Sequence, residues 1–149
     1  VFPLTDTWYV VYRNYKDDPA FGSAKCLMFK QTSAETENGH PLTSSYVGLD
    51  EPMIVLLSTA ASEGYSVNNL LKVVPENGGD AAEYHVIYGD TECSLTRNTY
   101  VSDDAMMVLM NKAHIDEKGP SGTCCDFIYT LLSGSTPKYE IYDDSCKTS

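Results

Sequence analysis

The sequence predicts an all-β domain with one helix near its carboxyl end. Eight short segments rich in β-branched and aromatic residues follow one another at regular intervals, and tight-turn residues separate them. The strand–helix alternation of a parallel α/β sheet does not appear. Such a succession is typical of an antiparallel meander closed into a barrel, or of a sandwich. With 149 residues, we expect residues 1–149 to form a single domain with a sizeable core.

The first predicted strand covers residues 7–15, and Pro19 in the turn behind it prevents further sheet pairing. The remaining strands are bounded by turn sequences such as LDEP, PENGGD and GDTE. They are expected at residues 24–32, 44–49, 52–59, 65–74, 83–89, 93–101 and 105–112.

One helix is predicted after the eighth strand. Ser121 or Thr123 can cap its start, and Gly134 can end it. We expect its apolar face to lie against the outside of the barrel, with Cys124 pointing into the contact. That face has helical spacing and consists of Cys124, Phe127, Ile128, Leu131 and Leu132. The following KYEIYDDSC reads as a short extended tail held down by Cys146.

Composition excludes several classes of function. The formal net charge is −11 and basic residues are not clustered, which argues against nucleic acid as a partner. No apolar run approaches the roughly 18 residues of a membrane helix, so we expect no membrane insertion. The start, VFPLTDTW, has no signal-peptide features, but a mature secreted chain would also lack them.

Five cysteines indicate an oxidising compartment and leave one thiol unpaired. Two disulfides and one free thiol can be arranged in about fifteen ways, and composition does not choose among them. We expect no metal site, because His40, His85 and His114 are scattered and no CxxC pair exists. Motifs for nucleophilic catalysis or phosphate binding are also absent, so we expect neither an enzyme nor a cofactor.

An eight-stranded barrel followed by a helix and a tail is the lipocalin plan. Residues 12–26, YRNYKDDPAFGSAKC, resemble the first-strand signature of the tick salivary lipocalins often called histamine-binding proteins. Residues 124–146, CCDFIYTLLSGSTPKYEIYDDSC, are similar to the carboxyl-terminal region of soft-tick members. The resemblance covers nearly the whole chain and implies an eight-stranded antiparallel up-and-down lipocalin barrel with the helix packed outside.

The resemblance also implies a disulfide pattern. Cys26 would bridge to Cys146, and Cys93 would bridge to Cys125, which leaves Cys124 without a partner. The competing arrangement joins Cys93 to Cys124 and leaves Cys125 free.

For function, the resemblance implies a secreted salivary protein that sequesters a host mediator and so suppresses host defence during feeding. The leading expectation is a biogenic amine, histamine or serotonin, bound by a monomer. A lipid mediator such as a leukotriene or fatty acid is the first alternative. A protein-binding lipocalin that acts through its loops is the second alternative, and an acidic, tyrosine-rich surface would permit it.

Amine-binding members carry an Asp on the seventh strand and a Glu and an aromatic residue on the eighth. By resemblance these positions correspond to Ser94, Val108 and Met110, so the two charges and the ring are missing. Their replacement predicts an apolar floor suited to a fatty chain.

A second amine pocket of the family maps onto Tyr15, Asp18 and Phe21, with Glu83 and His85 as further candidates. The alternative for Asp18 is turn chemistry before a proline, and for His85 an ordinary strand position.

A lipid acid would need a cation, and only Arg13 and Arg97 are arginines. The apolar pattern does not decide whether Arg13 faces the cavity, because both faces of its strand are apolar.

Overall fold

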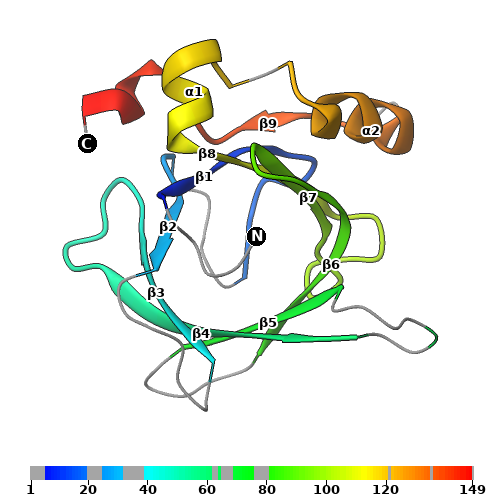
Figure 1. The fold of residues 1–149 in the computed structure, drawn as a ribbon, viewed down its shortest axis with the longest axis horizontal. Helices are drawn as coiled ribbons and strands as arrows, with labels where there is room; N and C mark the ends of the chain where they lie inside the picture. Colours follow the sequence, from blue (N-terminus) through cyan, green and yellow to red (C-terminus); the bar gives the residue numbers. More distant parts are fainter. Residues whose placement is uncertain are drawn as a thin grey trace.

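The computed structural model describes residues 6–19, 25–31, 39–61, 64, 69–75, 81–120, 122–134 and 136–148, without the side chains of the last two. These residues form a closed, eight-stranded antiparallel barrel with helices on one side (Figure 1). The strands are β1 (Trp8–Arg13), β2 (Met28–Gln31), β3 (His40–Ser45), β4 (Met53–Ala60), β5 (Leu70–Pro75), β6 (Ala82–Gly89), β7 (Cys93–Arg97) and β8 (Met106–Asn111).

Each strand pairs with the next along the chain, and the barrel closes because β1 pairs with both β2 and β8. The predicted up-and-down lipocalin barrel is therefore confirmed. A short outer strand, β9 (Tyr139–Glu140), adds to β1 through Tyr12 and Arg13, and a 3-10 helix follows at Asp144–Thr148.

Two helices are present where one was predicted. The predicted one is α2 (Cys124–Ser133), and the additional one is α1 (Lys112–Lys118), which continues directly from β8. The Asn111 side chain accepts a hydrogen bond from the His114 backbone N–H at 2.7 Å, and this cap starts the helix. The positive φ of Gly119 ends it.

The third strand lies earlier than predicted, at His40–Ser45 instead of residues 44–49. Gly39 permits this position. Its φ is +124°, and a Cβ there would lie 2.5 Å from the Leu57 carbonyl oxygen, so only glycine lets the two strands approach so closely.

A β-bulge in β1 decides which side chains enter the barrel. Val10 pairs with Leu109, but the register then shifts, so that Tyr12 pairs with Val108 and Arg13 with Met107. Paired residues share a face of the sheet, and both Leu109 and Met107 line the interior. Val10 and Arg13 therefore both point inward, although three positions separate them.

The orientation of α2 differs from the prediction. Its exposed face carries Phe127 and Leu131, which are 67% and 66% exposed, and Cys124 is also exposed. The buried face instead consists of Cys125, Tyr129 and Ser133. Two links to the barrel fix this orientation of α2. A disulfide joins Cys125 to the barrel, and the Tyr12 hydroxyl donates a hydrogen bond to Asp126.

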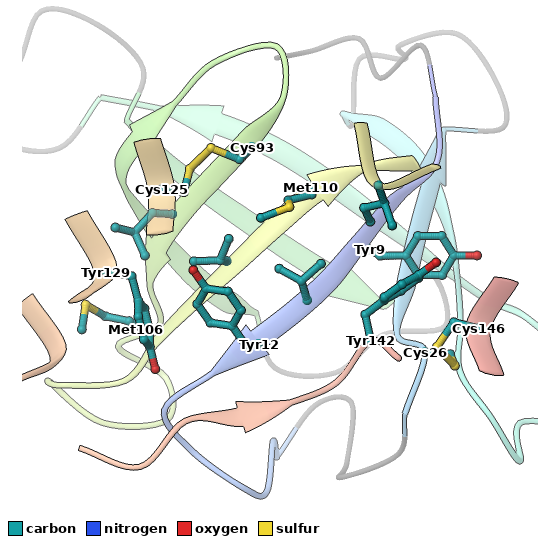
Figure 2. Packing of buried hydrophobic residues seen from close by; sticks show 14 residues of the cluster. Tyr9, Tyr12, Cys26, Cys93, Met106, Met110, Cys125, Tyr129, Tyr142 and Cys146 are labelled. Carbon is teal, nitrogen blue, oxygen red and sulfur yellow. A yellow bond between two sulfur atoms is a disulfide. The ribbon is translucent and has the colours of Figure 1, made fainter. Parts of the chain in front are cut away.

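The cluster between the barrel and the helices is the first of two apolar cores. Figure 2 shows Tyr12 packed against Tyr129, with Met110 on the same outer side of the barrel. Two disulfides fasten this layer: Cys93 to Cys125, and Cys26 to Cys146. These are the pairs that the family resemblance implies.

Candidate functional site

The second core encloses a cavity inside the barrel. It holds about 550 Å³ of empty space, a figure that includes its opening to solvent. All eight strands contribute to its wall through the inward residue of each pleat. The lining residues are Trp8, Phe29, Leu42, Leu57, Leu71, Val73, Tyr84, Ser94, Thr96, Met107 and Leu109.

The cavity wall is almost entirely apolar, and none of its lining residues is charged. Alternation along β7 and β8 explains which side chains reach it: Ser94 and Thr96 point inward from β7, and Met107 and Leu109 from β8. No residue of β8 is a carboxylate, so neither register of this strand could present one to a ligand.

A polar cluster forms where β1 ends, and Asp18 is its centre. The Asp18 carboxylate accepts hydrogen bonds from the hydroxyls of Tyr15 at 3.1 Å and Tyr100 at 2.5 Å. The Arg13 guanidinium lies 3.9 Å from the same oxygen, and both charged side chains are almost completely buried. The loops after β1 and β7 are thereby joined over this end of the barrel.

The cluster continues into the cavity wall. The hydroxyls of Tyr84 and Tyr100 lie 3.1 Å apart, and the Asn98 amide donates to the Tyr15 hydroxyl at 2.7 Å. The hydroxyl of Thr96, which lines the cavity, donates to the side-chain amide oxygen Oδ1 of Asn98 at 2.8 Å. The cavity is therefore apolar along its length and adjoins hydrogen-bonding groups at the Asp18 end.

The charges within the cluster compensate one another. Besides its contact with Asp18, Arg13 donates hydrogen bonds to the backbone carbonyls of Tyr15 at 3.0 Å and Lys16 at 2.7 Å. Burial raises the pKa of Tyr15 above its ordinary value, and the Asp18 carboxylate raises it further. The same two causes raise the pKa of Tyr84, so these hydroxyls remain protonated donors at neutral pH.

Of the predicted site residues, the structure brings Tyr15 and Asp18 together, and Phe21 lies outside the described residues. Glu83 and His85 point away from the cavity, because they alternate with Tyr84, which lines it. Glu83 instead lies 4.0 Å from Lys72 on the outer surface.

Val108 and Met110 also face outward, and the expectation that they form the cavity floor is corrected here. Both lie in the cluster under the helices, because β8 presents Met107 and Leu109 to the interior. The predicted apolar character of the floor holds, but different residues supply it.

Sequence reasoning missed Tyr84, Asn98 and Tyr100. Tyr84 stands at an alternate position of β6, and the other two follow β7 in the turn NTYVSDD. The available signal was Tyr100 next to Asn98 in this turn. It gives no information about a partner such as Asp18, which lies more than eighty positions earlier in the chain.

Among the described residues, no group of His, Cys, Asp and Glu could hold a metal ion. No helix in the described part of the chain is long and apolar enough to cross a membrane.

A closed antiparallel barrel of eight strands, a cavity lined by all of them and a helix outside define a ligand-binding protein of the lipocalin class. The chain belongs to the tick histamine-binding protein family, whose model matches residues 2–148. No curated protein sequence matches it. The family is one of lipocalins named for the binding of a small amine, and this class is generally not enzymatic.

Proposed function

We propose that this protein sequesters a small mediator with a predominantly apolar body, and that a lipid mediator such as a leukotriene or a fatty acid is the ligand class the geometry favours. The observation that carries this proposal is the cavity wall, in which eleven lining residues include no charged side chain. Each methylene buried against such a wall contributes about 0.8 kcal/mol, so an acyl chain gains affinity without a salt bridge.

The distribution of polar groups also fits an amphiphile, because the apolar wall adjoins hydrogen-bonding groups at the Asp18 end. The polar head of an amphiphile would lie at the Asp18 end, beside the polar cluster that includes Tyr84, Tyr100 and Arg13.

A biogenic amine remains the second candidate, supported by family membership and by the buried Asp18 carboxylate among tyrosine rings. An ammonium ion there would have to compete with Arg13, which already lies 3.9 Å from the carboxylate. The like charges would repel one another, so amine binding at this site is expected to be weak.

Secretion is part of the same proposal. Two disulfides are typical of proteins that fold in an oxidising compartment, and the family is one of tick proteins. Suppression of host defence by removal of a free mediator follows from such a location.

Titration calorimetry with a leukotriene, oleic acid, histamine and serotonin tests the ligand class. We expect submicromolar binding of a lipid and no submicromolar binding of either amine. Leu57→Trp should fill the cavity and abolish lipid binding, whereas Ile54→Trp, on the outward face of the same strand, should leave it unchanged. Submicromolar amine binding that is lost in Asp18→Asn would instead support the second candidate.

A further inference from the structure

The turn between β7 and β8 forms a flap at the Asp18 end of the barrel. The flap consists of residues 99–104, and a hydrogen bond from the Asn98 N–H to the Ala105 carbonyl, at 2.7 Å, closes its base. Most of the flap is exposed to solvent. Tyr100 differs, because its side chain packs against the apolar core that encloses the cavity. This side chain therefore connects the flap to the interior.

Tyr100 makes three contacts at the barrel end. Its ring lies edge-on to the Tyr84 ring, with the centroids 5.2 Å apart, and the two hydroxyls are separated by 3.1 Å. Its hydroxyl also donates a hydrogen bond to the Asp18 carboxylate at 2.5 Å. A hydrogen bond to a charged acceptor is stronger than one between neutral groups. Tyr84 lines the cavity and Asp18 belongs to the segment after β1, so one side chain joins the flap to both.

A second link between the flap and the barrel is weaker. The Asn14 side-chain amide donates a hydrogen bond to the Asp104 carbonyl at 2.7 Å, but this bond is exposed. Water can replace either partner there, so the bond contributes little to holding the flap in place. Tyr100 is therefore the main fastening of the flap.

The opposite end of the cavity is held by the backbone. Trp8 lines the cavity there, and it pairs with Phe29 on one side and with Asn111 on the other. The Thr7 carbonyl accepts a further backbone hydrogen bond from the Lys112 N–H at 2.8 Å. Opening this end would break hydrogen bonds of the sheet, whereas the Asp18 end opens once the flap loses its side-chain contacts. The Asp18 end is thus the easier route into the cavity.

We propose that Tyr100 is a latch, whose hydrogen bond to Asp18 holds the flap closed, and that a ligand enters and leaves the cavity when this bond opens. The inference goes beyond the proposed function, because it concerns the rate of ligand exchange and not the class of ligand. It rests on that function only in placing the ligand inside the cavity. Such a latch closes over the empty and the loaded cavity alike, so it slows binding and release by the same factor and leaves the dissociation constant unchanged.

Stopped-flow fluorescence of Trp8, the only tryptophan in the chain, measures both rates. Association is followed on mixing the protein with oleic acid. Dissociation is followed on mixing the complex with an excess of phosphatidylcholine vesicles, which take up the released acid. Tyr100→Phe removes the hydroxyl and keeps the ring. It should raise both rate constants about tenfold, with less than about a twofold change in the dissociation constant.

The matched control is Tyr88→Phe, which removes a tyrosine–aspartate hydrogen bond outside the cavity. The Tyr88 hydroxyl donates to Asp90 at 2.8 Å, and the control variant should leave both rates unchanged. Unchanged rates in Tyr100→Phe would overturn the latch. Faster release with unchanged association would overturn it too, because Tyr100 would then be a contact of the bound ligand.

Quenching of Trp8 emission by acrylamide in the empty protein gives a second readout that needs no ligand. The bimolecular quenching constant should be higher in Tyr100→Phe than in the wild type, because the cavity is open for a larger fraction of the time. It should be unchanged in Tyr88→Phe. Equal constants in all three proteins would contradict the latch. If oleic acid fails to bind while the quenching constant rises in Tyr100→Phe, the proposed function is wrong and the latch stands.

Discussion

Nη1 of Arg13 lies 3.9 Å from Oδ2 of Asp18 inside the barrel end, and each of these side chains is only 1% exposed. The pair brings two opposite charges out of water together, and the tyrosine hydroxyls and backbone carbonyls around it supply the remaining hydrogen bonds. It therefore closes one end of the cavity without leaving a net charge there. Under the proposed function, this compensation explains how a member of a family named for an amine would hold a ligand with an apolar body.

Arg13→Met should lower the free energy of unfolding by about 3–5 kcal/mol, because the Asp18 carboxylate then stays buried without its cation. The double variant Arg13→Met/Asp18→Asn should recover part of that loss, since the uncompensated charge is gone. Urea unfolding of the wild type, both single variants and the double variant measures the coupling. Additive losses would show that the two charges do not interact.

Alkaline pH should destabilise the fold through the buried tyrosines. The pKa of Tyr84 is raised above 10.0 by burial and by Asp18, so the folded state holds this proton more tightly than the unfolded state does. Its contribution to stability is fully present below pH 10 and is lost as pH rises above it, at up to about 1.4 kcal/mol per pH unit. The urea concentration at the unfolding midpoint should be measured between about pH 8 and 11, a range that spans the ordinary tyrosine pKa. It should fall less steeply with rising pH in Tyr84→Phe than in the wild type. An identical fall in both proteins would contradict the assignment, and Tyr139→Phe on β9 serves as the control.

Truncation should destabilise the protein much more on the buried face of α2 than on its exposed face. Tyr129→Ala removes a ring packed edge-on against Tyr12 at 4.8 Å, and should cost roughly 3 kcal/mol of unfolding free energy. Phe127 belongs to the face that the sequence pattern predicted to be buried, but its side chain is 67% exposed, so Phe127→Ala should cost less than about 0.5 kcal/mol. Thermal and urea unfolding of both variants decide the matter. A larger loss for Phe127→Ala would mean that the helix docks through the other face.

Cys124 should react as the single accessible thiol of the native protein. It is exposed and unpaired, whereas its neighbour Cys125 is buried in the disulfide to Cys93. A chromogenic disulfide reagent should therefore modify one thiol per chain without denaturant, and none in Cys124→Ser. If Cys93 were joined to Cys124, the free thiol would be the buried Cys125, and no reaction would occur until the protein unfolded.

The sequence pattern was sufficient to predict eight strands, because turn residues separate eight apolar segments. It left a barrel and a sandwich open, and the resemblance of both chain ends to the tick lipocalins decided for the barrel that the structure shows. The sequence could not predict which side chains of β1 point into the barrel, because all the residues in the middle of this strand are apolar or aromatic and all are buried: Tyr9, Val10, Val11 and Tyr12. The bulge after Val10 allows Val10 and Arg13 to point inward together, which neither uninterrupted alternation permits. A one-residue shift of this kind leaves no trace in a strand that is buried on both faces.

The helices show two further limits. The segment that forms α1 is seven residues long and follows a strand without a turn, so its periodicity is too short to detect. In α2 the apolar stripe predicted the wrong face, because the disulfide at Cys125 and the hydrogen bond at Asp126 fix the orientation against the hydrophobic pattern. The site residues Tyr84, Asn98 and Tyr100 could not be linked to Asp18 by sequence, since only the closed barrel brings them together.

The central claim is that the apolar cavity binds a lipid, and Trp8 offers the most direct measurement. It is the only tryptophan in the chain, and it lines the cavity. Its fluorescence emission therefore reports occupancy of this site alone, without a label. Titration with oleic acid should produce a saturable change in emission at one ligand per chain, and histamine, which does not fluoresce in this range, should produce none. A saturable change with histamine and none with oleic acid would contradict the account.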